Sequence, residues 1–247
     1  MLTTLAPAAR GPRLFYFGLT ATLIFIIALG FGPGYLGRAG EAEPLPAFVH
    51  IHAAVFSFWM LLVLAQTGLI AADRVAVHRK LGLIGALLVP FVFALGWQTM
   101  VFGAQRGHPF WKTPDQFVPP SLPFADSLEF MIVPFGDLVV FTLFVAAGLW
   151  LRRKAELHKR LMLLAAAGGM LWPAISRLPF VTGSRGPTGL VVLMPLLLAM
   201  VLYDRRMLGR VHPATLWGGV LIVASIPLRA LLAGTPLWRA FATWATG

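Results

Sequence analysis

Six side chains that titrate or carry charge interrupt segments of this sequence that are otherwise apolar. They are His50, His52, Glu129, Asp137, Arg177 and Arg229. An ionisable group in hydrocarbon is costly unless it is paired or hydrated, so such groups usually mark a site. We therefore expect a pocket for a small ligand, a metal ion or a proton. Its walls would be His52, Asp137, Arg177 and Arg229, with His50 and Glu129 at its mouth, and its candidate metal ligands are His52 and Asp137.

The two neighbouring histidines point in different directions. Residues two apart on a helix are turned by about 200°, so His50 and His52 do not face the same partner. His52 is in line with Trp59 and Gln66 at intervals of seven, which gives a partly polar stripe. We expect His52 to face inward, as a ligand or a proton-handling group. The alternative is a core imidazole bonded to a neighbouring helix.

The acidic residues near position 130 fit two roles. Asp126-Ser-Leu-Glu129 has the shape of a capping box, in which an acid at the N-cap is followed three residues later by Glu. The pattern favours capping for Asp126 and leaves Glu129 divided between capping and a site role. On one continuous helix, Asp126, Glu129 and Asp137 would share an arc of roughly 80°.

Asp137 has no capping role to explain it. It follows Pro134, whose missing N–H frees a carbonyl one turn earlier and opens the local backbone to a ligand or another side chain. Arg177 and Arg229 are its candidate neutralisers, and a purely structural ion pair is the alternative. Planar guanidinium groups also suit a ligand carboxylate, a haem propionate or a lipid phosphate. A further alternative is that the two arginines snorkel toward the membrane surface.

Three more histidines each begin an apolar segment beside basic residues: His78, His158 and His212. Imidazole is the usual axial ligand of b-type haem, so two of the three would suffice for a haem site. Gly82 and Gly85 would leave room for a flat macrocycle. The alternative is interface anchoring, because basic clusters at helix ends usually contact phospholipid.

The elements that position these side chains are membrane helices. The 247 residues are 58% hydrophobic and only 12% charged, with a mean hydropathy of +0.81, whereas about 25% of the residues of a soluble protein are charged. The chain has no cysteine, which excludes disulfides, thiolate metal sites and iron–sulfur clusters. The net charge of +11 lies in short loops, so it favours membrane topology over nucleic-acid binding.

We predict one all-α transmembrane domain over residues 1–247, because seven apolar runs are long enough to cross a hydrocarbon core of about 30 Å. The predicted spans are residues 14–36, 47–72, 81–103, 127–151, 161–180, 188–203 and 216–234. We expect no separate soluble domain.

The basic residues predict the orientation of this seven-helix bundle. With the N-terminus inside, the cytoplasmic segments hold 13 of the 20 Lys and Arg residues, against five on the other side. This asymmetry favours an N-in, C-out protein. The longest connection, Ala104 to Ala125, is rich in proline and aromatic residues and predicts an ordered cap that is either a lid or an inert interfacial loop.

The chain resembles a group of uncharacterised bacterial multi-pass inner-membrane proteins. The resemblance extends from the second predicted span onward, and five runs carry it: His50-Ile-His52, Gln66-Thr, His78-Arg-Lys-Leu-Gly, His158-Lys-Arg-Leu-Met and His212-Pro-Ala-Thr-Leu-Trp-Gly-Gly. It implies a bacterial inner-membrane location and no specific activity. A looser similarity to transmembrane b-type cytochromes rests on histidines at helix ends and implies a haem cofactor.

Four functional hypotheses follow. The first is a membrane protein with a pocket that opens toward the periplasm, in which Asp137 and the arginines exchange partners as a ligand enters and His52 titrates nearby. The second is a b-type haem redox protein. The third is a non-catalytic subunit or scaffold in contact with lipids and a partner or a second copy, and the fourth is a metal-dependent membrane hydrolase. The sequence does not decide whether the protein is an enzyme.

Overall fold

The computed structural model describes residues 10–36, 45–107, 124–178 and 185–247, and its regular structure is entirely helical in those residues. Ten helices are present there: α1 (Arg10–Leu36), α2 (Ala47–Ala71), α3 (Val75–Arg106), α4 (Ser127–Phe130), α5 (Ile132–Trp150), α6 (Ala155–Gly169), α7 (Leu171–Ile175), α8 (Arg185–Leu208), α9 (Pro213–Ala233) and α10 (Pro236–Thr246). The predicted cap between Ala104 and Ala125 lies mostly outside the described residues.

Five helical segments of the described chain are long and apolar enough to cross a membrane: Arg13–Leu36, Ala47–Ala71, Val75–Arg106, Ser127–Trp150 and Pro213–Ala233. They correspond to the first four predicted spans and the seventh. This confirms the all-helical class, and the length and apolarity of the five segments indicate a multi-pass membrane protein. The fifth predicted span is divided between α6 and α7, and the sixth lies within α8.

The division between α6 and α7 has a local cause. Pro173 has no N–H, so the carbonyl of Gly169 loses the helical donor that lies four residues further on. α6 ends at Gly169, and the short α7 begins at Leu171. Residues 161–178 therefore do not form a single straight helix. Pro173 thus interrupts the fifth predicted span.

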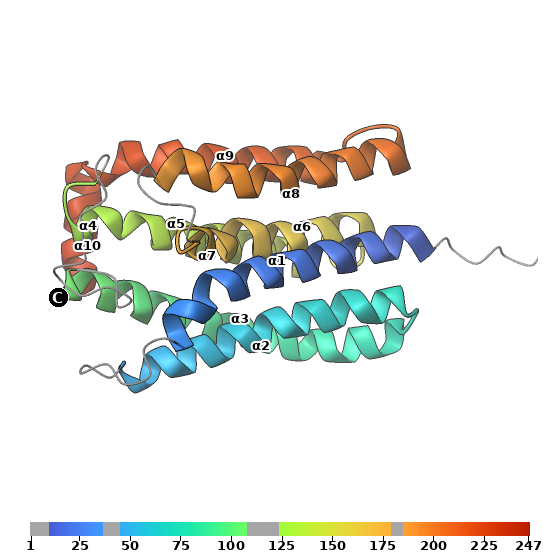
Figure 1. The fold of residues 1–247 in the computed structure, drawn as a ribbon, viewed down its shortest axis with the longest axis horizontal. Coiled ribbons are helices and arrows are strands. Elements are labelled where there is room, and N and C mark those ends of the chain that lie inside the picture. Colours follow the sequence, from blue (N-terminus) through green and yellow to red (C-terminus); the bar gives the residue numbers. More distant parts are fainter. Residues whose placement is uncertain (1–9, 37–44, 108–123, 179–184) are drawn as a thin grey trace, which may run out of the picture.

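The long helices run side by side, and the connections between them gather at two ends (Figure 1). One end holds the start of α1 and the α2–α3, α5–α6 and α8–α9 turns. We call it the basic end because these turns and the adjoining helix ends carry the 13 basic residues assigned to the cytoplasmic side: Arg10, Arg13, Arg74, Arg79, Lys80, Arg152, Arg153, Lys154, Lys159, Arg160, Arg205, Arg206 and Arg210. The opposite end holds α4 and α10, and we call it the α10 end. The basic segments therefore share one end, as alternating spans require.

α10 was not predicted from the sequence. Thr235 caps it, with the side-chain oxygen accepting from the backbone N–H of Trp238 at 3.3 Å, and Pro236 occupies the first turn. The indole N–H of Trp238 then donates to the carbonyl of Leu128 at 2.9 Å. α10 thus lies across the end of the bundle, nearly perpendicular to the long helices (Figure 1).

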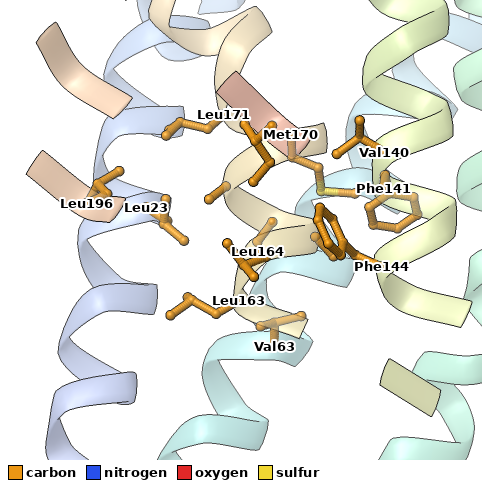
Figure 2. Packing of buried hydrophobic residues seen from close by; sticks show 14 of the residues in the cluster. Leu23, Val63, Val140, Phe141, Phe144, Leu163, Leu164, Met170, Leu171 and Leu196 are labelled. Carbon is orange, nitrogen blue, oxygen red and sulfur yellow. The ribbon is translucent and has the colours of Figure 1, made fainter. Parts of the chain in front are cut away.

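The main core lies between α1, α5, α6 and α7 and the inner face of α8, where leucine, phenylalanine and methionine side chains interlock (Figure 2). Glycine allows a close contact between α5 and α6. A Cβ atom added to Gly169 of α6 would lie 2.9 Å from the carbonyl oxygen of Asp137 on α5. Small residues at such contacts let membrane helices approach closely, which fixes the backbone position of Asp137.

A buried ion pair at the basic end joins α6, α8 and α9. Arg160 and Asp204 are both fully buried, and Arg160 donates to Asp204 through Nε at 3.0 Å and through Nη2. The second carboxylate oxygen of Asp204 accepts from the Thr215 hydroxyl at 2.5 Å and from the backbone N–H of His212 at 3.1 Å. Every partner that a buried pair needs is present, so this network holds α8 against its neighbours.

Candidate functional site

A cavity of about 2220 Å³ lies between the helices, and we call it the central cavity. Residues of α1, α2, α3, α5, α7, α8 and α9 line it, and most of them are apolar. Five of the six predicted pocket residues are in its wall: His50, His52, Asp137, Arg177 and Arg229. The sixth, Glu129, is not among its lining residues.

Asp137 and Arg229 form a buried ion pair between α5 and α9. The Nη1 atom of Arg229 lies 2.5 Å from Oδ1 of Asp137 and also donates to the carbonyl of Val133 at 3.0 Å. Nη2 of Arg229 donates to the Ser225 hydroxyl at 3.3 Å. Of the two arginines considered as neutralisers, Arg229 is the partner. Val133 directly precedes Pro134, but the carbonyl that the missing N–H of Pro134 frees is that of Phe130, one turn earlier.

Gly136 makes room for this pair. A Cβ atom at position 136 would lie 2.6 Å from Cζ and 2.8 Å from Cδ of Arg229, so the guanidinium occupies the space of the missing side chain. The arginine can therefore lie flat against the α5 backbone and reach both Asp137 and Val133. Sequence reasoning missed Gly136, and its place beside an intramembrane aspartate is the signal that could have found it.

The ion pair is not fully satisfied by protein. Oδ2 of Asp137 and Nε of Arg229 are buried and make no hydrogen bond in the described structure. A second cavity, of about 10 Å³, adjoins Asp137, Ser225 and Arg229, which is about the volume of one water molecule by the same measure. A carboxylate oxygen that the protein leaves unpaired is a ready acceptor for a group that enters from outside.

His52 faces inward, as predicted, and its ring is oriented by α3. Its Nδ1 lies 3.1 Å from the hydroxyl of Thr99, and that hydroxyl donates to the carbonyl of Leu95 at 2.8 Å. Because a hydroxyl has one proton, His52 is the donor through Nδ1, and Nε2 keeps a lone pair. The ring stacks on Phe56 with centroids 3.9 Å apart. His52 therefore presents a hydrogen-bond acceptor at the cavity wall.

His50 lies at the edge of the same cavity and is exposed. Its Nδ1 is 2.5 Å from the phenol oxygen of Tyr35, so it pairs with α1 and not with α3. The two histidines accordingly have different neighbours, as their angular separation predicts. Tyr35 lines the cavity too, and sequence reasoning missed it because nothing in the spacing connects the end of α1 to His50.

Arg177 lies on the cavity wall just after α7 and contacts α1. Its guanidinium is 4.3 Å from the ring centre of Phe31, a cation–π contact, and Nη1 donates to the carbonyl of Pro173. It does not form an ion pair with Asp137. Within the described residues, the Asp, Glu, Lys and Arg side chains of the lining are Asp137, Arg177 and Arg229.

Glu129 belongs to the α10 end. Asp126 caps α4 by accepting from the backbone N–H of Glu129 at 2.8 Å, and Glu129 reaches back to the N–H of Ala125 at 2.7 Å. This confirms the capping-box prediction with the contact shifted by one residue. Arg239 of α10 then binds Glu129 at 2.7 Å and Asp126 at 2.9 Å. These acids dock α10 and do not form the mouth of the cavity, because α4 is a separate turn whose acids face α10.

The three remaining histidines separate into a pair and a cap. The rings of His78 and His158 are 6.2 Å apart between centroids, at an interplanar angle of 81°. His212 caps α9, with its Nδ1 accepting from the backbone N–H of Ala214 at 3.1 Å. The space beside Gly82 and Gly85 is filled from α2, by Gln66 and Leu62, so it is not the room for a macrocycle that the sequence suggested.

A multi-ligand metal cluster is not found among the described residues, which contain no group of three or more His, Cys, Asp or Glu side chains placed to hold an ion. His52 is hydrogen-bonded to Thr99, and Asp137 is paired with Arg229, so the two candidate metal ligands have different partners. The chemistry that this wall offers is hydrogen bonding and ion pairing to an acidic group, within an otherwise apolar space.

Comparison of the chain with protein-family models, with curated proteins and with solved structures gave no match.

Proposed function

We propose that this protein is a bacterial inner-membrane protein that binds an amphipathic molecule with an acidic head group in the central cavity. One observation supports the proposal above all others. The wall of a cavity of about 2220 Å³ is mostly apolar, but it carries polar groups from four places in the fold. They are His52 of α2, Asp137 of α5, Arg177 just after α7 and Arg229 of α9. Pockets for drug-sized ligands have volumes of roughly 300–1,000 Å³, so this cavity is sized for a long-chain lipid or isoprenoid.

The charges indicate the head group. The lining carries the guanidinium groups of Arg177 and Arg229 and the carboxylate of Asp137. Guanidinium groups bind carboxylate and phosphate through paired hydrogen bonds, and the free lone pair of His52 accepts from a protonated acid. The apolar chain would then lie against the lining residues of α1, α3 and α8.

Binding would work by exchange of partners at Arg229. An entering carboxylate or phosphate competes with Asp137 for the guanidinium. A buried carboxylate without its cation is costly, so the displaced Asp137 takes up a proton. Ligand binding is then coupled to proton uptake, and the coupling depends on Asp137.

We further propose that all seven predicted spans cross the membrane, with α6 and α7 together as the fifth and α8 as the sixth, and that the N-terminus is cytoplasmic. This places the basic end inside and the α10 end in the periplasm, as the distribution of Lys and Arg favours. Because the chain has no cysteine, single cysteines at the exposed Ala72 and Ala240 report each end separately. A membrane-impermeant maleimide is expected to label Ala240→Cys in intact spheroplasts and Ala72→Cys only after lysis, and the reverse pattern overturns the orientation.

Binding of palmitate, methyl palmitate and hexadecylamine to the purified protein tests the proposed head group. The three probes share one chain and differ in charge. We expect palmitate to bind most tightly and the amine most weakly. Arg177→Gln should remove the preference for the acid, whereas Arg239→Gln, which lies outside the cavity, should keep it. Equal binding of the three probes, or an unchanged preference in Arg177→Gln, would refute the proposal.

A further inference from the structure

The central cavity reaches further toward the basic end along some helices than along others. On α2 its lining stops at Leu61 and on α3 at Val92, so the turns of both helices nearest the basic end lie outside it. On α9 the lining continues to Thr215, in the first turn of the helix. The cavity is therefore prolonged toward the basic end beside α9, and we call this prolongation the α8–α9 channel.

One face of α8 and one face of α9 form the α8–α9 channel. The two helices run side by side along the bundle (Figure 1). The residues that line the channel are Leu197, Leu198 and Val201 of α8 and Thr215, Leu216, Gly219 and Val220 of α9. Within each set the residues recur at intervals of three or four, which places them on one side of their helix. All of them except Thr215 are apolar, so the channel suits a hydrocarbon chain.

A buried polar network lies at the basic end of this channel. Val201 is one turn before Asp204 on α8, and the Thr215 hydroxyl donates to Asp204 at 2.5 Å. Asp204 also accepts from Arg160, whose side chain is fully buried. A hydrocarbon chain that advanced past Thr215 would have to separate these groups, and a buried charge without its partner is costly. The network therefore forms the floor of the channel.

The length of α9 between this floor and Arg229 corresponds to a particular chain length. Thr215 and Arg229 lie near opposite ends of α9, and residues 215 to 229 span about 21 Å at a rise of about 1.5 Å per residue. An extended alkyl chain advances about 1.25 Å for each carbon, because its C–C bonds of about 1.5 Å meet at tetrahedral angles. The span therefore accommodates about 16–18 carbons.

We propose that the α8–α9 channel is a molecular ruler that selects acidic ligands with a straight alkyl chain of about 16–18 carbons. The inference rests on the proposed function, since it takes the acidic head group to be held at Arg229. The first part of the chain lies in the wide part of the cavity, beside α1, α3 and α8, and the terminal carbons lie in the channel. A shorter chain leaves the channel unfilled, and a longer chain meets the Asp204 network.

Gly219 is the position at which a substitution should shorten the ruler. A Cβ atom added there would lie 4.0 Å from both Cδ atoms of Leu197, an ordinary van der Waals contact that does not force α8 and α9 apart. The ring of Gly219→Phe would extend beyond this contact and occupy the channel. Residues 219 to 229 span about 15 Å, which leaves room for about 12 carbons. Leu221 is exposed and lies outside the lining, so Leu221→Phe is the matched control on the same helix.

Competition of decanoate, laurate, palmitate, stearate and behenate against radiolabelled palmitate on the purified full-length protein tests the ruler, with hexadecylamine as the head-group control. We expect palmitate and stearate to bind at least about tenfold more tightly than decanoate, which leaves a void, and than behenate, which meets the buried network. Gly219→Phe should bind laurate most tightly, and Leu221→Phe should keep the wild-type order.

The failure of the ruler is distinguishable from the failure of the proposed function. If palmitate is preferred over hexadecylamine but the five acids bind equally, the ruler alone is overturned. A Gly219→Phe protein that still prefers palmitate to laurate also overturns it. If palmitate and hexadecylamine bind equally, the head-group site is absent and both proposals are overturned. The wild-type series gives its answer without any variant, so the test stands even if Gly219→Phe does not fold.

Discussion

Replacing Gly136 by alanine adds one methyl group at the point where Arg229 lies against α5. The new Cβ atom would stand 2.6 Å from Cζ of Arg229, so the guanidinium must move away from Oδ1 of Asp137 and from the carbonyl of Val133. Breaking a buried ion pair so that one charge is left alone costs about 3–5 kcal/mol. Alanine is favoured over glycine within a helix by about 1 kcal/mol. The net expectation for Gly136→Ala is a loss of about 2–4 kcal/mol in the free energy of unfolding.

The control is the same substitution where there is space. Gly18 of α1 has no atom within 4 Å of an added Cβ, so Gly18→Ala should be neutral or stabilising by up to about 1 kcal/mol. The assay is reversible unfolding by SDS in mixed micelles, followed by far-UV circular dichroism. In an Arg229→Ala background the methyl group meets no guanidinium, and Gly136→Ala should cost little. An equal cost of Gly136→Ala in both backgrounds would refute the reasoning, because the clash with Arg229 would then not be its cause.

Two further predictions concern the ends of the bundle. At the basic end, burial alone would raise the pKa of Asp204, but hydrogen bonds from Arg160, Thr215 and the backbone N–H of His212 outweigh it and hold this pKa below its ordinary value. The contribution of ionised Asp204 to the free energy of unfolding is therefore complete above about pH 4 and is lost as the pH falls through the lowered pKa. Unfolding measured as a function of pH should show this loss, and the Asp204→Asn protein should not show it. At the α10 end, Arg239→Ala should release α10 and raise its hydrogen exchange while leaving the exchange of α5 unchanged; unaltered exchange in α10 would contradict the role given to Arg239 as its anchor.

Apolar segment length predicted most of the helices because a membrane helix is specified locally, by roughly 20 apolar residues in a row. It did not predict the end of α6 at Gly169, four residues before Pro173. It also missed α10, whose Thr235-Pro236 start is a recognisable helix beginning. That helix is too short to span and follows the last apolar run, so a search for spans passed over it.

In the candidate site, too, features set by a single helix were predictable, and features set by contacts between helices were not. The inward direction of His52 followed from its seven-residue stripe, and Asp126 and Glu129 followed from capping spacing, since both are properties of one helix. The choice of Arg229 over Arg177 as the partner of Asp137 did not follow, because it depends on how α9 and α7 stand around α5. The Arg160–Asp204 pair was hidden in the same way: its members are 44 residues apart and looked like ordinary loop charges.

His52, Asp137 and Arg229 all line the central cavity, and they illustrate how far a charge in a membrane segment can be interpreted. Each residue was expected to face protein because lipid exposure is costly. That argument applies equally to a structural ion pair and to a ligand site. What favours a ligand site is the space beside the pair and the carboxylate oxygen of Asp137 that receives no hydrogen bond from the residues that the structure describes.

Native mass spectrometry of the protein, purified in mild detergent from membranes of a bacterial host, tests the central proposal most directly. We predict a bound amphiphile with a carboxylate or phosphate head in stoichiometric amount, retained in Arg239→Gln and lost in Arg177→Gln. Protein that is free of bound amphiphile, or that carries the same lipids in both variants, would contradict the assignment of the central cavity as a site for an acidic, long-chain ligand.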